Sequence, residues 1–219
     1  PALLEPYGLA MANLGDIDRQ TVAGAISTGT HGTGLGFGGI ATQVVGATLV
    51  SGTGEVVTVG EDDPRLKAVA LGLGALGILV EVTLQCVDRF VLEATEAPMS
   101  LAETVDGFVE RVRGVDHFEF FWFPDTDRVL AKTNERHRDV SRRAPMPRWK
   151  DRLENDLLSN RLFGAINRLT TRVPRSTAAI NQVSARALSA KTYTDWSHIV
   201  YPTERDVVFR ESEFSVPRA

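Results

Sequence analysis

The sequence predicts an α+β protein made of two parts that meet near residue 90. Three observations lead to this prediction. β-Branched runs flank a turn-forming tetrapeptide at 51–54, segments with helical apolar spacing lie between strand-like segments, and the residue pattern changes after Arg89. The two parts are therefore expected to cover residues 1–89 and 90–219.

The first part is expected to contain a hairpin, a short helix and a further strand. Residues 43–50 and 55–59 are rich in β-branched side chains and flank Ser51-Gly52-Thr53-Gly54, which predicts a β-hairpin. A short helix that opens on a proline is expected over 64–71. Residues 78–87 begin with an apolar run and then alternate, which predicts a strand.

The second part begins with a helix and continues with paired strands. Ser100 and Glu103 stand three residues apart as in a capping box, so a helix is expected over 100–112. The aromatic run 117–123 and the segment 128–133 are expected to pair as strands. Further on we expect a helix over Thr177–Ala190 and strands over Ser197–Tyr201 and Asp206–Val216.

Composition excludes several classes of function. A chain of 219 residues with 43% hydrophobic and 24% charged residues is globular rather than disordered, and a net charge of −4 does not suit a general binder of polyanions. Cys86 is the only cysteine, so no intramolecular disulfide and no cysteine-rich metal site can form. The spacing of His117, His137 and His198 suits no metal, and each is expected to be a surface or strand residue.

One segment is strongly basic. Residues 132–175 hold twelve Lys or Arg against five Asp or Glu, and their middle has helical periodicity. Such a helix can lie on an anionic membrane surface or contact nucleic acid. The favoured interpretation is a solvated helical insertion at about 134–190 in a cytoplasmic protein that binds no nucleic acid, with membrane association as the less favoured alternative.

Glycine is concentrated near the start of the chain. Such a run permits close approach of backbone N–H groups to a ligand, because no Cβ is in the way. Two windows, 34–39 and 72–77, match G-x-G-x-x-G, but neither has a strand before it and a helix after it, as a nicotinamide dinucleotide site requires. Residues 72–77 are expected to form a tight helix-to-strand connection. The glycines of the first run are Gly15, Gly24, Gly29, Gly32, Gly34, Gly36, Gly38 and Gly39.

The segments NLGDIDRQTVAGAISTGTHGTG (13–34) and GLGALGILVEVTL (72–84) resemble the FAD-binding domain of the vanillyl-alcohol-oxidase (VAO/PCMH) type of flavoprotein. Within that group the chain is most similar to sugar-1,4-lactone oxidases and alditol oxidases. The resemblance implies that residues 1–89 are the C-terminal half of an FAD-binding domain. It implies that residues 90–219 begin an α+β substrate (cap) domain.

The resemblance also implies which residues contact FAD. Hydroxyl groups there would donate hydrogen bonds, glycines would admit the diphosphate, and valine at Gly29 or Gly32 is expected to abolish flavin retention. Asp16 falls where the loop passes the flavin ring, although alditol oxidases have serine there, and Ile78 matches a position that meets the cofactor through its backbone. The remaining expected cofactor residues are Thr21, Gly24, Thr28, Gly29, Thr30, His31 and Gly32.

The activity implied by the resemblance is oxidation of an alcohol carbon of a sugar-1,4-lactone or polyol by hydride transfer to FAD, with oxygen or another acceptor reoxidising the flavin. The family's Glu-x-Arg pair and His-x-Lys motif are expected beyond Ala219, and its second glycine-rich loop is expected to be missing, since residues 1–12 read as a helix-like lead-in and cannot form it. The chain is therefore expected to be a fragment without catalytic residues. The alternative is a non-redox module that binds a nucleotide or an anionic surface.

Overall fold

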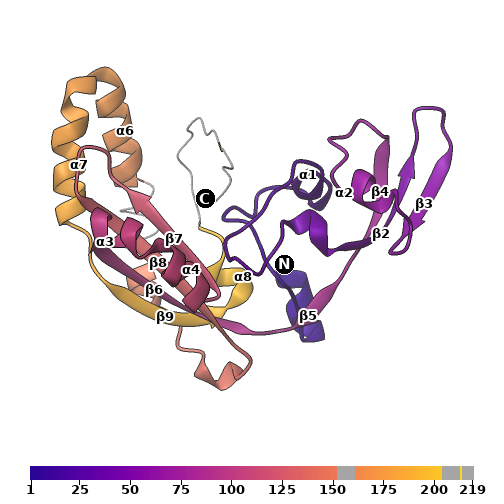
Figure 1. Ribbon diagram of the computed structural model, residues 1–219, viewed down its shortest axis with the longest axis horizontal. Helices are drawn as coiled ribbons and strands as arrows, with labels where there is room; N and C mark the ends of the chain where they lie inside the picture. The colour runs from indigo at the N-terminus through magenta and orange to yellow at the C-terminus, as the bar shows by residue number, and fades with distance from the viewer. Residues whose placement is uncertain (152–160, 204–212, 214–219) are drawn as a thin grey trace.

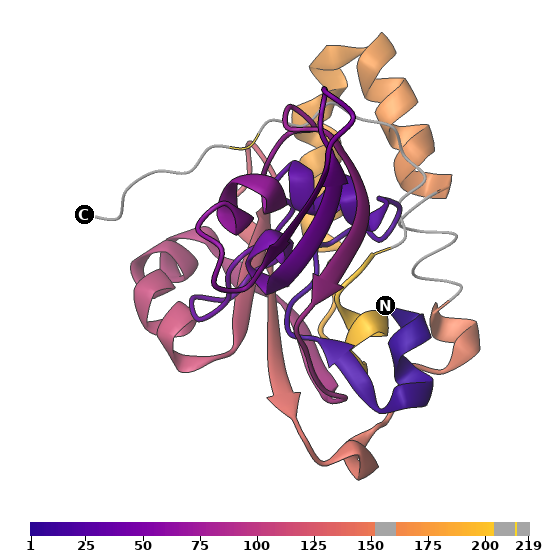
Figure 2. The ribbon, with the colours of Figure 1, turned by 90° about the vertical axis from the view of Figure 1, so that its right-hand side faces the viewer.

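The computed structural model describes residues 1–151, 161–203 and 213. Two antiparallel sheets of unequal size dominate it, with helices packed beside each of them, so the chain is α+β as predicted (Figures 1 and 2). Within these residues, no helix is long and apolar enough to cross a bilayer.

The first sheet has three strands in the order β3-β2-β4, all antiparallel. Helices α1 and α2 cover one of its faces and bury a core that includes Ile26, which is fully buried, and Val59. The opposite face carries exposed apolar side chains on β3 and β4, among them Val56 and Ile78. The elements are α1 (Val22–Ser27), η2 (Ile40–Gln43), β2 (Val44–Val50), β3 (Val56–Gly60), α2 (Leu66–Ala70) and β4 (Ile78–Leu84).

The second sheet has four antiparallel strands in the order β7-β8-β6-β9. Helices α3 and α4 pack on it, with the Phe108 ring set edge-on to Phe118 and Phe120 at about 6 Å. The elements are β6 (Val91–Ser100), α3 (Leu101–Asp106), α4 (Phe108–Gly114), β7 (His117–Trp122), β8 (Arg128–His137), β9 (Lys191–Trp196) and α8 (Ser197–Val200).

The two sheets are joined by a short crossing of the chain. After η1 (Ala2–Tyr7), strand β1 (Leu9–Met11) pairs with β5 (Cys86–Asp88), and β6 begins three residues later. A shared hydrophobic cluster unites Ala10 and Leu14 from the first part with Leu92 from β6, and with Val200 and Tyr201 near the end of the described chain. The change of sheet therefore falls next to Arg89, where the sequence pattern changes.

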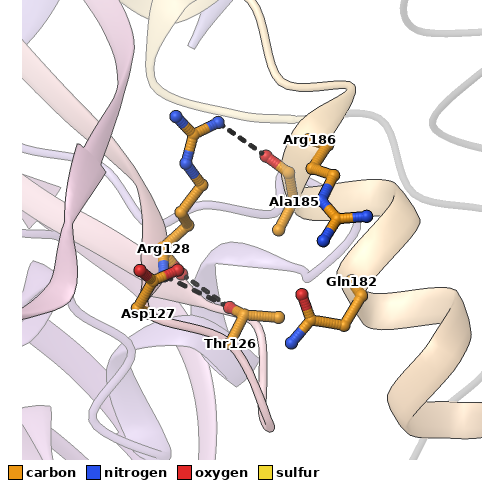
Figure 3. A pocket seen from close by; sticks show the side chains of 6 residues that line it. All are labelled: Thr126, Asp127, Arg128, Gln182, Ala185 and Arg186. Atoms are coloured by element: carbon orange, nitrogen blue, oxygen red, sulfur yellow. Dashed lines mark hydrogen bonds between the residues drawn. The ribbon is translucent and has the colours of Figure 1, made fainter.

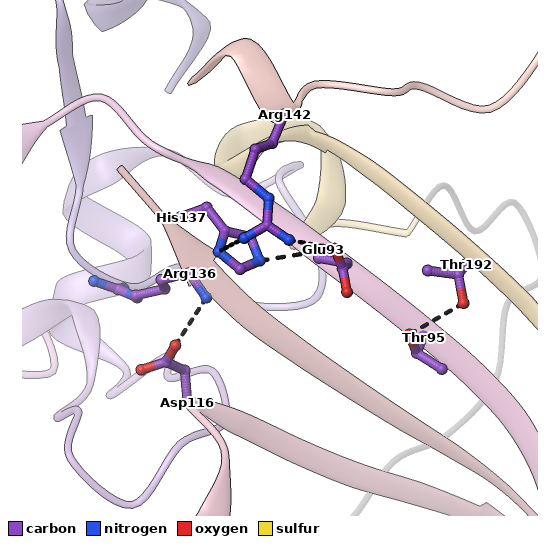
Figure 4. A network of polar contacts seen from close by, with 7 residues as sticks. All are labelled: Glu93, Thr95, Asp116, Arg136, His137, Arg142 and Thr192. Atoms are coloured by element: carbon purple, nitrogen blue, oxygen red, sulfur yellow. Dashed lines mark hydrogen bonds and ion pairs between the residues drawn. The ribbon is translucent and has the colours of Figure 1, made fainter. Parts of the chain in front are cut away.

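The basic segment is fastened to the second sheet at its start. The Arg142 guanidinium lies 2.9 Å from Nδ1 of His137 and 3.4 Å from a carboxylate oxygen of Glu93 (Figure 4). Arg143 binds Asp195 at 2.6 Å. Beyond this point lie η3 (Val140–Arg142), α5 (Arg148–Asp151), α6 (Phe163–Arg172), η5 (Pro174–Ser176) and α7 (Thr177–Arg186).

Most predicted elements are confirmed, but one is wrong, and the helix expected over 100–112 is divided at Gly107 into α3 and α4. The hairpin at 44–60, the connection at 72–77 and the pairing of 117–122 with 128–133 are present, and Ser100 Oγ accepts a hydrogen bond from the Glu103 N–H. The predicted strand at 197–201 is wrong, because Ser197–Val200 form α8 and Tyr201 follows it. Strand β9 ends at Trp196, and the bond from Tyr201 N to Ser197 O closes a helical turn instead.

Two further predictions concern the ends of this region. The expected insertion at about 134–190 overlaps the end of β8, which continues to His137. The predicted strand over 206–216 lies outside the described residues, apart from Glu213.

Candidate functional site

The loop between β1 and α1 is held by a buried pair of amides. Gln43 donates from Nε2 to the Asn13 carbonyl at 2.8 Å, and its Oε1 accepts from the Ala12 N–H at 3.0 Å. Asn13 is buried; its side chain accepts from Leu14 N and donates to Thr33 O at 3.1 Å. These bonds tie the start of the glycine-rich segment to its middle, so the whole of 13–33 is one folded unit.

Helix α1 is capped at its first turn. Thr21 Oγ1 accepts from the Gly24 N–H at 3.1 Å, as a helix-capping threonine does. The Thr28 hydroxyl donates to the Gly24 carbonyl at 2.9 Å. Gly29 follows with φ +75°, a left-handed conformation that favours glycine after a helix. Thr21, Gly24, Thr28 and Gly29 thus lie together on one short helix and its ends.

The loop after α1 folds back on the segment before it. The Thr30 hydroxyl donates to Gln20 Oε1 at 2.9 Å, and a Cβ built on Gly15 would lie 2.9 Å from the Thr30 methyl group. A Cβ on Gly32 would lie only 2.1 Å from the Leu14 carbonyl oxygen. Gly32 is therefore required where two protein backbones touch, whether or not a ligand is bound.

His31 is exposed at the edge of this loop and both of its ring nitrogens face acceptors. Nδ1 lies 2.8 Å from the Gly32 carbonyl oxygen and Nε2 lies 2.5 Å from a carboxylate oxygen of Glu213. The Gly32 carbonyl raises the pKa of His31, partial burial opposes it, and Glu213 raises it further. Protonated imidazole, which donates from both nitrogens, suits this geometry.

Asp16 lies in the loop before α1, and Ile78 lies at the start of β4. The Asp16 carbonyl accepts a hydrogen bond from Thr203 N at 2.8 Å. Asp16 follows Gly15, which packs against Thr30. Ile78 is 73% exposed and begins β4 opposite Val50. The linker that precedes it touches the end of α1 through the bond from Leu73 N to Ser27 O at 3.2 Å.

The described surface is suited to a cofactor that lies along it. A Cβ at Gly36 or at Gly74 would meet no atom within 4 Å, so bare backbone faces open space at both positions. A hollow of about 70 Å³ lies beside Thr21 and is lined mainly by apolar side chains such as Ile17 and Val22. This volume is far below the several hundred Å³ of a typical cofactor pocket. This hollow is therefore too small to enclose a cofactor by itself.

A larger cavity of about 410 Å³ lies elsewhere, between the β7–β8 turn and α7 (Figure 3). Thr126 and Asp127 from the turn, and Arg128 at the start of β8, face Gln182 and Arg186 from the helix. None of the predicted cofactor residues lines it. Among the described residues, no group of three or more His, Cys, Asp or Glu is arranged to hold a metal ion.

Sequence reasoning missed the groups that the second sheet presents to the glycine-rich segment. His117, expected to be a plain surface or strand residue, is 1% exposed and binds the Thr33 carbonyl at 2.9 Å. Phe37, Arg136 and Tyr201 surround it. A histidine at the start of an aromatic strand is a weak signal of a functional role. Nothing in the sequence linked His117 to Thr33 or to Tyr201, each of which lies 84 residues away.

Two protein-family models match the chain. Residues 82–219 match the model of D-arabinono-1,4-lactone oxidase, and residues 2–60 match that of an FAD binding domain. The L-gulono-1,4-lactone dehydrogenase of Mycobacterium tuberculosis is 37% identical over 210 residues, which are 96% of this chain and 48% of that protein. The L-gulonolactone oxidase of Bos taurus is 38% identical over 128 residues, which cover 58% of this chain and 29% of that protein.

A solved structure shares the fold at low sequence identity. The cholesterol oxidase of B. sterolicum superposes with a TM-score of 0.67 at 20% identity, covering 90% of this chain and 42% of that one. The VAO/PCMH-type fold is thereby confirmed, and FAD is the cofactor that the matched models indicate. The chain spans about half the length of the relatives that match it over most of its residues. It belongs to the D-arabinono-1,4-lactone oxidase family.

Proposed function

We propose that the protein is an FAD-dependent oxidoreductase that oxidises an alcohol carbon of a sugar-1,4-lactone or a polyol. The observation that carries this proposal is the match of residues 82–219 to the D-arabinono-1,4-lactone oxidase model, joined to a glycine-rich surface of the kind that flavin diphosphates use. The relatives named above are called after a 1,4-lactone or a gulonolactone, which favours the lactone over the polyol.

Bound FAD supplies the acceptor for the hydride that leaves the alcohol carbon, and oxygen or another acceptor then takes the electrons. The work of this chain is to bind and orient that cofactor. Thr21, Gly24, Thr28 and Gly29 would line the diphosphate from α1, and Thr30, His31 and Gly32 would continue the surface. Asp16 would lie where the loop passes the flavin ring, and Ile78 would contact the cofactor through its backbone.

His31 would add charge to this surface. Its raised pKa extends the range in which the imidazolium is present toward neutral pH, and a positive group beside a diphosphate is favourable. Because Glu213 already faces the ring, we expect the attraction to be partly neutralised. His31 is therefore proposed to assist cofactor binding rather than to dominate it.

An absorbance spectrum between about 300 and 550 nm tests the proposal. We expect flavin bands near about 375 and 450 nm in the purified protein, and loss of the 450 nm band when a 1,4-lactone is added without oxygen. Folded protein that shows no flavin bands even after incubation with excess FAD would contradict the proposal. If flavin bands are present but no sugar lactone or polyol bleaches them, the proposed cofactor stands and the proposed substrate class is wrong.

A matched pair of variants tests where the cofactor lies. Thr28 and Thr42 are both threonines of the glycine-rich region whose hydroxyls donate to a backbone carbonyl, at 2.9 and 2.7 Å. Only Thr28 belongs to the proposed cofactor surface. In the FAD complex the single hydroxyl hydrogen of Thr28 would turn from the Gly24 carbonyl to the diphosphate. Thr28→Ala should then weaken FAD binding by roughly tenfold, the effect of one lost hydrogen bond to a charged group, while Thr42→Ala should not. Equal affinities would remove Thr28 from the site.

The alternative function is a non-redox module that binds an anionic surface. It is favoured by α6, which ends at Arg172 and exposes Phe163 and Leu169. Cosedimentation with vesicles that contain anionic lipid would support it, provided that the same protein shows no flavin.

A further inference from the structure

Three polar side chains from distant parts of the sequence meet beside the glycine-rich segment, next to Thr33. His117 begins β7, Arg136 lies near the end of β8, and Tyr201 follows α8. His117 and Tyr201 are buried, with 1% and 6% exposed. The Tyr201 oxygen lies 3.0 Å from His117 Nε2 and 2.9 Å from an Arg136 guanidinium nitrogen.

The proton positions in this group follow from its partners. A backbone carbonyl only accepts, so His117 Nδ1, at 2.9 Å from Thr33 O, carries a hydrogen. In the neutral ring Nε2 then accepts, and the Tyr201 hydroxyl donates to it. The tyrosine oxygen in turn accepts from Arg136, which has donors only. The hydrogen bonds therefore run in one direction, from Arg136 through Tyr201 and His117 to Thr33.

The end of this chain of bonds is the turn at residues 33–37. Thr33 O also accepts from Asn13 Nδ2, so both of its lone pairs are used. The Phe37 ring stacks on His117 with centroids 4.8 Å apart and planes 11° from parallel. The Arg136 guanidinium carbon lies 4.1 Å from the centroid of the Phe37 ring and 4.3 Å from that of Phe90, a cation–π sandwich.

The turn at residues 33–37 packs closely against the start of β7 in the second sheet. Gly34 has φ +103°, and a Cβ there would lie 2.5 Å from Asp116 O and 2.9 Å from His117 Nδ1. The Arg136 backbone N–H is held by the Asp116 carboxylate at 2.8 Å (Figure 4). Two residues after Tyr201, Thr203 binds the carbonyl of Asp16, so the same segment holds the other end of the glycine-rich loop.

We propose that His117, Tyr201 and Arg136 are positioning residues that fix the shape of the glycine-rich loop from the second sheet and thereby set the affinity of the loop for FAD. The cofactor part of this inference rests on the proposed function; the loop-fixing part does not. The arrangement requires neutral His117. A proton on Nε2 would face the Tyr201 hydroxyl, and that hydroxyl could no longer donate to the ring.

The surroundings of His117 favour the neutral ring. Burial lowers the pKa of His117, the Thr33 carbonyl opposes this, and the positive charges of Arg136 and Lys132 lower it while Asp116 raises it. Tyr201 stays protonated, since burial raises its pKa to about 12. The hydroxyl that donates to His117 is therefore protonated throughout the pH range in which His117 titrates.

The test uses Tyr201→Phe, which keeps the ring and removes the hydroxyl, and Tyr7→Phe as the control, since Tyr7 is exposed on η1. In the protein without added FAD, we expect amide hydrogen exchange at residues 33–37 to accelerate roughly tenfold in Tyr201→Phe, as one lost hydrogen bond predicts, and to stay unchanged in Tyr7→Phe. Unchanged exchange in Tyr201→Phe would overturn the loop-fixing role, whether or not the protein binds flavin.

A second measurement follows FAD affinity against pH. Asparagine at position 117 can still donate to Thr33 but carries no titrating ring. Wild-type affinity should fall as the pH drops through the lowered pKa of His117, whereas His117→Asn should bind FAD more weakly and should lack the step that His117 causes. The same step in both proteins would show that His117 does not act on the cofactor. Wild-type protein that binds no FAD would reject the proposed function, and the exchange result would still decide the loop-fixing role.

Discussion

Replacing Gly32 with alanine should destabilise the protein even when no flavin is bound. The added Cβ would lie 2.1 Å from the Leu14 carbonyl oxygen and 2.9 Å from Asn13 Oδ1, whereas Cβ contacts in real proteins do not fall below 3.0 Å. Both neighbours are buried, and Asn13 is held by Gln43. The two backbones must therefore separate by roughly an ångström, since neither can turn aside as a flexible side chain does.

The magnitude follows from the cost of overpacking. Extra methylene groups in a packed interior cost about 1–3 kcal/mol, and a clash between two backbones belongs at the upper end. We therefore expect Gly32→Ala to lower the free energy of unfolding by about 3 kcal/mol. That is a large share of the roughly 5–15 kcal/mol that stabilises a typical domain.

Gly36→Ala is the matched control. It lies in the same loop, and a Cβ there would meet nothing within 4 Å. Its effect should be within about 1 kcal/mol and in the stabilising direction, because alanine restricts the unfolded chain. The assay is urea unfolding of the flavin-free protein, followed by tryptophan fluorescence.

The comparison separates two roles for Gly32. The sequence predicted that this glycine admits the ligand, in which case Gly32→Ala without flavin would be as stable as Gly36→Ala. Equal unfolding midpoints would therefore refute the packing role drawn from the structure. A loss of stability with Gly32→Ala alone would show that the loop needs the glycine before any cofactor arrives.

Three further predictions concern single groups. Thr21→Ala should cost about 1 kcal/mol in urea unfolding, because Gly24 N loses its cap, and Thr21→Ser should restore it; an alanine variant of wild-type stability would contradict the cap. Because the pKa of His117 lies below its ordinary 6.5, the unfolded chain binds the proton more readily, so stability should fall as pH drops from 6.5 toward the lowered value. His117→Asn should remove that component from the pH series of unfolding midpoints, and an unaltered series would show that the ring is not buried as described. Cys86→Ser should leave flavin binding intact, since the thiol has only a 3.9 Å contact with a backbone carbonyl; loss of flavin from folded protein would place this strand in the site.

Local signals in the sequence sufficed for most of the elements. Turn residues at 51–54, the capping pair Ser100–Glu103 and the aromatic run at 117–123 each act within a few residues, and each formed what it predicts. The error at Ser197–Tyr201 has a tertiary cause. Pairing with β6 fixes β9 at 191–196, and the chain must then leave the sheet to reach the cluster around Leu92.

The candidate site could be predicted only in part. The glycine-rich segment was visible because glycine and threonine cluster there, and the family resemblance suggested which of them meet FAD. The roles of individual glycines were not visible, since Gly32 and Gly36 look alike in sequence but differ in what surrounds them. The His117 network was hidden for a similar reason, because its partners Thr33 and Tyr201 each lie 84 residues away along the chain.

The bonds that hold the glycine-rich loop have a consequence for biosynthesis. The hydrogen bond to the Thr33 carbonyl needs His117, and the one to the Asp16 carbonyl needs Thr203. The loop therefore cannot reach its final shape until almost 190 residues after Asp16 have left the ribosome. A contact of such sequence separation forms late, after the local hairpins and helices. We therefore expect the nascent chain to carry an unfinished loop until residue 203 has been synthesised. Flavin would be captured only after the second sheet has assembled, and a ribosome stalled before residue 201 would hold a chain that cannot retain it.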